Sequence, residues 1–383
     1  MGLTYLVRER ENVVMNPESQ TAKTPPGPAK LPKASVVFRL AAIGLVVCAI
    51  AGLFAYAGGW LTPGAITPAR IADRFEMLNG RHEGFRRNHA KGVCVSGYFT
   101  GNGEGAALSK ASVFRAGRVP VLGRFSLSGG QPYTADAATA VRGLGLRFTP
   151  DTGEEWRTAM VSLPVFPVST PQAFYELLQA TAPDPATGKP DGAKMQALFA
   201  KYPSTAKALG MIQSHPISSG FENTTFNGLN AFGFANAAGE KNWVRWSMVP
   251  VQPFEPINPA GLEKGSTNQL FDALIAAIHR HPLEWHLMIT IAQPGDPTDN
   301  AALPWPADRR QVDVGTLTLE RVESDDTSPA RDINFDPLVL PDGIAASDDP
   351  LLSARSAVYA RSFTRREGEQ KYPSAISPAE TAK

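Results

Sequence analysis

The chain has 383 residues, a formal net charge of +1 and 19% charged residues, enough for one large domain or two small ones. This charge balance provides no basic surface, so we expect no nucleic-acid partner. The two cysteines, Cys48 and Cys94, form neither a CxxC motif nor a metal-ligand spacing, and we predict no disulfide between them.

The N-terminal part contains a polar stretch and then an apolar one. Residues 1–35 are polar and rich in proline, which is typical of a disordered tail. The uncharged stretch that follows predicts a transmembrane anchor over 36–61, because about 20 apolar residues cross a bilayer core. A cleaved signal peptide is the alternative, but the long preceding tail and the marginal cleavage sequence Ala55-Tyr56-Ala57 favour an anchor.

Flanking charges indicate the orientation of this segment. Lys30, Lys33 and Arg39 lie on its N-terminal side, and Trp60 marks the other end. Because positive charges stay in the cytoplasm, we predict a cytoplasmic tail and an exported domain over 62–383. The protein would then be a single-pass inner-membrane protein whose domain faces the periplasm.

The rest of the chain alternates between helical and strand patterns. A helix is predicted after Pro68, where Ile71, Phe75 and Leu78 share one face. Four strands are predicted at 92–99, 119–126, 143–149 and 155–162, and four more at 230–237, 242–249, 284–293 and 311–320. Helices are predicted at 171–180, 193–201, 203–213 and 267–279, the last capped by Thr267 or Asn268. Two groups of four antiparallel strands fit a closed barrel with outer helices, and a sandwich fits the same pattern.

Two segments carry candidate chemistry. His89 lies just before the strand 92–99, where a fixed imidazole can transfer a proton near neutral pH; a lone histidine there is also an ordinary core or surface residue. Near the other end, Arg355 and Tyr359 are four residues apart and share one helix face. A guanidinium beside a phenol favours the phenolate, which is one of the few protein groups that ligate haem iron.

Together these segments resemble the catalase family. The resemblance spans roughly 70–370 and rests on several short motifs in the family's order. These are Arg86-Arg87-Asn88-His89-Ala90-Lys91-Gly92, Arg124-Phe125-Ser126, Pro164-Val165-Phe166, 230–234, Phe335-Asp336-Pro337, 340–344, and Arg355 with Tyr359 and Arg366. Since the catalase domain is an antiparallel eight-stranded β-barrel, the resemblance favours the barrel over the sandwich.

The resemblance also implies a haem b site, held non-covalently because the chain has no CxxCH motif. In it Tyr359 is the iron ligand, with Arg355 against its oxygen, and His89 is the catalytic histidine, hydrogen-bonded by Ser126. The family pattern assigns the haem propionates to three arginines, since a guanidinium matches a carboxylate. These are Arg86, Arg124 and Arg366. Phe174 matches the family's aromatic residue over the haem face, although its helical spacing is equally that of a core residue.

The expected function is that of a compact, catalase-related peroxidase. Catalases carry a distal asparagine that helps to hold a second peroxide, and Ser162 is interpreted as standing at that position. The expected reaction is reduction of hydrogen peroxide or an organic peroxide, through a ferryl intermediate, by an external electron donor such as a membrane or periplasmic redox protein. The alternatives are a small true catalase, a haem-dependent hydroperoxide isomerase or dehydratase, and a haem-binding protein without turnover.

Overall fold

The computed structural model describes residues 32–58, 60–62, 64–137, 141–258 and 266–378. The chain divides into a unit up to Ala65 and a second unit from Ile66. In the first unit, helix α1 (Lys33–Ala57) has apolar side chains exposed on all sides, as in helices that lie in lipid. It is long and apolar enough to cross a membrane, and a signal sequence has the same properties. Most of the predicted tail 1–35 lies outside the described residues.

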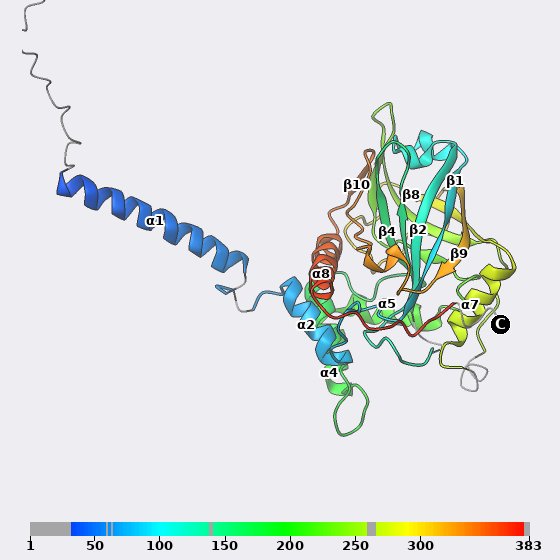
Figure 1. The fold of residues 1–383 in the computed structure, drawn as a ribbon, viewed down its shortest axis with the longest axis horizontal. Helices are drawn as coiled ribbons and strands as arrows, with labels where there is room; N and C mark the ends of the chain where they lie inside the picture. The colour runs from blue at the N-terminus through cyan, green and yellow to red at the C-terminus, as the bar shows by residue number, and fades with distance from the viewer. Residues whose placement is uncertain (1–31, 59, 63, 138–140, 259–265, 379–383) are drawn as a thin grey trace, which may run out of the picture. The chain divides into compact units, whose positions relative to one another are not determined.

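The second unit is built on a closed antiparallel β-barrel (Figure 1). Eight strands pair around the ring in the order β7-β5-β4-β3-β2-β1-β9-β8, and β8 pairs with β7 to close it. The strands are β1 (Gly92–Gly101), β2 (Gly117–Leu127), β3 (Arg142–Phe148), β4 (Trp156–Val161), β5 (Phe226–Asn227), β7 (Lys241–Pro250), β8 (Leu283–Ile291) and β9 (Gln311–Glu323). The predicted barrel is therefore confirmed, and the sandwich is excluded.

The fifth predicted strand differs from the structure. The pattern at 230–237 corresponds to β6 (Phe232–Ala235), which pairs with β7 outside the ring and with β10 (Ile344–Ala346). The strand that joins β7 to β4 is instead the two-residue β5. Neither β5 nor β10 is predicted, because two or three residues are too few to show an alternating pattern.

The barrel interior is filled mainly by aromatic and aliphatic side chains. Trp156, Trp246 and Trp285 are at most 3% exposed, and Trp156 packs edge-on against Trp246 with ring centroids 5.2 Å apart. On β4 the inward residues Trp156, Thr158 and Met160 alternate with more exposed ones. Because strand side chains alternate between faces, the intervening residues of β4 point out of the barrel.

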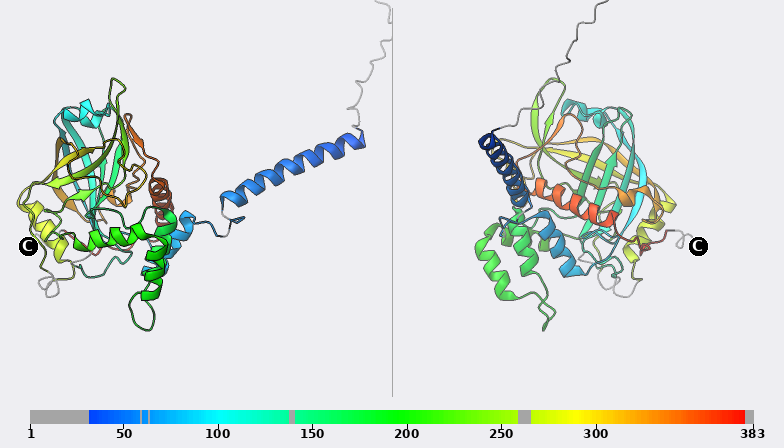
Figure 2. Two further views of the ribbon diagram at one scale, coloured as in Figure 1. Left: turned by 180° about the vertical axis from the view of Figure 1, so that it is seen from behind. Right: turned by 60° about the vertical axis from the view of Figure 1, so that its left-hand side comes forward.

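Helices lie outside the barrel (Figures 1 and 2). They are α2 (Pro68–Asn79), α3 (Pro171–Ala180), α4 (Gly192–Lys201), α5 (Pro203–Ser214), α7 (Gln269–Arg280) and α8 (Pro350–Glu367). Helices α2, α3 and α8 contact one another, whereas α7 packs against β9. The cap predicted for α7 is only partly correct: Asn268 is the N-cap residue, but its side chain makes no capping hydrogen bond.

Candidate functional site

A deep cavity lies between the outer face of the barrel and helices α2, α3 and α8. Its empty volume is about 1340 Å³, part of which is open to solvent. Residues of the barrel and of all three helices line it, so the cavity brings together parts of the chain that are far apart in the sequence.

One wall of the cavity is a row of residues that face each other across four strands. The register pairs Ser126 with Gly143, Gly143 with Val161, and Val161 with Asn227. Directly paired residues project from the same face of a sheet, and all four residues line the cavity. Along this row the barrel presents the Ser126 hydroxyl, then a gap at Gly143, which has no side chain. The Val161 isopropyl group and the Asn227 amide follow.

His89 lies over the gap in this row. The imidazole Nδ1 is 3.1 Å from Ser126 Oγ, and a Cβ on Gly143 would lie 3.0 Å from the ring, so the missing side chain makes room for it. His89 also has a positive φ of 57°, a conformation that non-glycine residues adopt at a cost and that clusters at functional sites.

Electrostatics keep this imidazole neutral. Burial, and next the positive charges of Arg124 and Arg86, lower the pKa of His89 from 6.5 to about 4. At neutral pH the ring therefore has one nitrogen free to accept a proton. This is the protonation state that a general base requires.

The structure does not bring Ser162 to this wall. Its Oγ accepts a hydrogen bond from the Arg142 N–H at 3.0 Å, and Ser162 does not line the cavity, whereas Val161 does. Since side chains alternate along β4, the residue after Val161 points to the opposite face. The position predicted for Ser162 is therefore wrong, and the residue beside His89 on β4 is Val161.

The opposite side of the cavity is formed by α8, which carries Tyr359 and Arg355. The Arg355 guanidinium lies over the Tyr359 ring, 5.8 Å from its centroid, and donates to Ala159 O at 2.9 Å. Its other Nη donates to Asn230 Oδ1. The prediction that Arg355 and Tyr359 share one helix face is confirmed. The expected contact of Arg355 was with the Tyr359 oxygen, whereas the structure shows the guanidinium over the aromatic ring.

Two residues behind Arg355 were not predicted. Asn230 Nδ2 donates to Asp349 Oδ2 at 2.8 Å, and both side chains are buried. Asp349 is also the N-cap of α8 and accepts from the Leu351 N–H; burial is the main cause that raises its pKa. The chain Asp349–Asn230–Arg355 fixes the guanidinium against Tyr359. The sequence signal for Asp349 was the cap pattern of an acid followed by proline.

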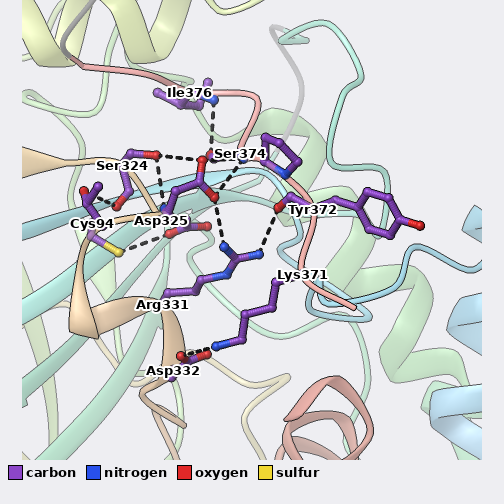
Figure 3. Close-up of polar contacts among 12 residues, drawn as sticks. Cys94, Ser324, Asp325, Arg331, Asp332, Lys371, Tyr372, Ser374 and Ile376 are labelled. Atoms are coloured by element: carbon purple, nitrogen blue, oxygen red, sulfur yellow. Dashed lines mark hydrogen bonds and ion pairs between the residues drawn. The ribbon is translucent and has the colours of Figure 1, made fainter. Parts of the chain in front are cut away.

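Arg86, Arg124 and Arg366 all line the cavity, but they are not equivalent: Arg124 and Arg366 are buried and Arg86 is half-buried. Arg124 binds Asp325 through Nε and Nη2, the latter at 2.7 Å. Burial alone would lower the pKa of Arg124, but the Asp325 carboxylate raises it. Asp325 in turn accepts from Cys94 Sγ at 3.1 Å (Figure 3). Arg124 is therefore charge-compensated within the protein, and it also donates to His89 O at 2.8 Å.

Arg86 and Arg366 have no such compensation. Both donate to Arg331 O, at 3.0 and 2.7 Å, and the described residues provide no salt-bridge partner for either. Burial, then repulsion by neighbouring guanidiniums, lowers the pKa of Arg366 to about 10 and that of Arg86 well below its usual value. One buried and one half-buried guanidinium without an ion-pair partner, both lining the cavity, fit an anionic ligand group.

The remaining lining is aromatic and apolar. Phe174 packs against Phe75 and Phe166, with ring centroids 6.0 and 5.7 Å apart. Phe335 occupies the space that a side chain on Gly145 would fill, since a Cβ there would lie 2.7 Å from its ring. The cavity thus combines apolar walls with cations at one part of its lining, a histidine on one side and a phenol on the other. These features fit a haem.

Fold and site together define a β-barrel protein whose cavity fits a haem, and comparison with known proteins identifies the family. A family model described as catalase matches residues 71–373, so the chain belongs to the catalase family. The family and the fold imply a haem cofactor.

Individual relatives agree with this assignment. The catalase-related peroxidase of Synechococcus elongatus is 40% identical over 301 residues, covering 79% of this chain and 89% of that protein. The catalase-related peroxidase of Mycolicibacterium paratuberculosis is 30% identical over 306 residues, covering 80% and 96%. Of the solved structures, a bacterial catalase has a TM-score of 0.66 at 20% identity, and catalase A from Saccharomyces cerevisiae one of 0.68 at 19%. Those matches cover 79% and 78% of this chain but only 62% and 64% of the solved chains.

Proposed function

We propose that the protein is a haem b-dependent peroxidase that reduces hydrogen peroxide or an organic peroxide with electrons from an external donor. The observation that carries this proposal is that His89 and Tyr359, 270 positions apart in the sequence, line the same cavity with two uncompensated arginines. The similarity to catalase-related peroxidases supports it.

The residues have separable roles in holding the cofactor. Tyr359 would ligate the iron through its phenol oxygen, and Arg355, fixed from behind by Asn230, would hold its guanidinium against the Tyr359 ring. Arg86 and Arg366 would bind the propionates, since each guanidinium matches a carboxylate. Arg124 has most of its donors bound to Asp325 and to backbone carbonyls, so its contribution to an anion is the smallest of the three.

The bound haem supplies the redox chemistry, in which the peroxide O–O bond is cleaved. His89 contributes proton transfer: as a neutral base it takes the proton from one peroxide oxygen and delivers it to the other, so that water leaves. Ser126 holds the ring through Nδ1 and fixes its orientation. Such a positioned base contributes about 10²–10⁴-fold to the rate.

The wall beside His89 favours an external donor over a second peroxide. Val161 has no hydrogen-bonding group, and the Asn227 amide nitrogen already donates to Leu163 O at 2.9 Å. The position next to His89 on β4 therefore offers a second peroxide no hydrogen bond, and Asn227, one strand further along the row, keeps one of its two amide hydrogens. Disproportionation of peroxide, as in a small true catalase, is the alternative outcome.

We infer the location of the enzyme from its N-terminal helix. With Arg39 near the start of α1 and Trp60 beyond its end, the helix would tether the domain to the outer face of the inner membrane, within reach of a membrane or periplasmic redox protein. Protease added to spheroplasts should then digest the domain. A protected domain would contradict this topology, and a mature protein that starts after residue 57 would show that the helix is a cleaved signal.

Haem reconstitution tests the cofactor assignment. The purified protein, supplemented with haem b, should bind one equivalent and give a Soret band that survives gel filtration. Extraction with acidified acetone should remove the haem, since no covalent attachment is expected. A protein that retains no haem, or that carries a different metal, would contradict the proposal.

A further inference from the structure

A short aromatic path connects the cavity-lining Arg86 to the protein surface. Phe85 precedes Arg86 in the chain and is buried. The Tyr133 ring packs edge-on against Phe85, with ring centroids 5.6 Å apart and an interplanar angle of 75°. Tyr133 itself is 54% exposed. One buried ring therefore separates an exposed phenol from the residue that borders the cavity.

Arg331 ties the two ends of this path together. Its backbone carbonyl accepts from Arg86 and from Arg366, the two uncompensated arginines of the cavity. Its guanidinium lies over the Phe85 ring, 5.9 Å from the centroid. The same guanidinium donates to Tyr372 O at 3.0 Å. Arg331 thus contacts both cavity arginines, the Phe85 ring and the backbone of Tyr372.

The C-terminal segment fixes a second phenol beside the first. Tyr133 Oη donates to Pro373 O at 2.7 Å, and the adjoining Tyr372 is 43% exposed. Ile376, which is 1% exposed, anchors the segment in the core. In Figure 3 the Tyr372 ring points away from the Arg331 guanidinium. The two phenols are therefore ordered and accessible.

We propose that Tyr133 and Tyr372 form a surface oxidation site for phenolic donors that are too large to enter the cavity. This inference rests on the proposed peroxidase function. Tyr133 gives one electron through Phe85 toward the cavity and releases its phenolic proton to solvent. A donor phenol at the surface then transfers a hydrogen atom to the tyrosyl oxygen, which restores Tyr133 and leaves a donor phenoxyl radical. Two such cycles supply the two electrons and two protons that convert one hydrogen peroxide into two waters.

Phenols suit this site for two reasons. Their O–H bond resembles that of tyrosine, so hydrogen-atom exchange between the two requires little driving force, and their rings pack well on an exposed aromatic side chain. Tyr133 also stays in the protonated form, because burial, and then the Asp326 carboxylate, raise the pKa of its phenol further above neutral. At neutral pH it is therefore a protonated phenol.

The test compares the full-length, haem-loaded wild type with the Tyr133→Phe/Tyr372→Phe double variant. Both substitutions keep the rings and remove only the hydroxyls. The probes are free guaiacol, which is small, and guaiacol coupled to dextran, which cannot enter the cavity. We expect the double variant to lose oxidation of the polymer-bound phenol and to retain oxidation of free guaiacol. Tyr98→Phe, a partly exposed tyrosine on β1, is the matched control and should oxidise both.

A second readout does not depend on turnover. After addition of one equivalent of peroxide without a donor, a spin trap followed by peptide mass spectrometry should locate a radical adduct at Tyr133 or Tyr372. A Tyr133→Trp/Tyr372→Phe variant, which has an oxidisable ring at position 133 in place of phenylalanine, should recover the oxidation of the polymer-bound phenol that the double phenylalanine variant loses. An adduct found elsewhere, or a double variant that oxidises the polymer-bound phenol at the wild-type rate, would overturn the inference. A wild type that oxidises neither phenol would instead contradict the proposed peroxidase function.

Discussion

The substitution Gly143→Ala tests the proton-transfer geometry, because it adds a single methyl group beside His89. A Cβ at this position would lie 3.0 Å from His89 Cε1 and 2.9 Å from Ser126 Oγ, whereas ordinary contacts begin at 3.4 Å. Gly143 is held between β2 and β4 by the register on both sides, so the backbone has little room to retreat. The imidazole must therefore tilt by a few tenths of an ångström, and its contact with Ser126 must lengthen.

The size of the effect follows from how steeply catalysis depends on geometry. A misplacement of about 1 Å can cost 10²-fold, so a few tenths should lower the rate of peroxide reduction by about 10-fold. His89→Ala sets the upper limit, at about 10²–10⁴-fold. Stopped-flow measurement of the first step with peroxide gives the rate, and the Soret absorbance checks that haem is retained.

Gly192→Ala is the matched control, because a Cβ there meets nothing within 4 Å. It should leave the rate unchanged. A Gly143→Ala variant that keeps both the haem and the wild-type rate would refute the idea that the gap in the strand row positions His89.

Three further predictions concern the two sides of the cavity. Because the pKa of His89 is lowered to about 4, peroxide reduction should persist through pH 5 and fall only as the pH drops through about 4; a stopped-flow pH profile with its midpoint near 6.5 would contradict this. Tyr359→Phe should sharply weaken haem binding in a spectrophotometric titration and Arg355→Leu should weaken it less, whereas unchanged spectra in both would place the iron ligand elsewhere. Val161→Asn should raise oxygen evolution, measured with an electrode, by placing an amide on the wall beside His89, and Ser162→Asn should not; equal effects would contradict the strand alternation.

The barrel was predictable because its main strands are long enough for alternation to show. The pattern in β4, for example, places Trp156 and Met160 in the interior and leaves Val161 outside. The closing element was not predictable, since β5 has only two residues. It becomes a strand through pairing with both β4 and β7, and such long-range pairing has no local sequence signal.

The site shows the same difference between features that are visible along the chain and features that depend on long-range contacts. His89 and Tyr359 stand in motifs that can be read along the chain, and the structure brings them to one cavity. The serine was misplaced because aligning a motif does not say which face of a strand each residue occupies, and a shift of one residue reverses the face. The partners Asp325 and Asn230 were missed because they meet Arg124 and Arg355 only in the folded chain.

The stoichiometry of peroxide consumption tests the central claim most directly. A known amount of hydrogen peroxide is added to the haem-loaded protein with guaiacol present, while donor oxidation is followed optically and oxygen with an electrode. The proposed function predicts two one-electron donor oxidations for each peroxide consumed, and little consumption when guaiacol is omitted. Rapid consumption without donor, with one oxygen molecule released for every two peroxides, would show that the protein is a true catalase.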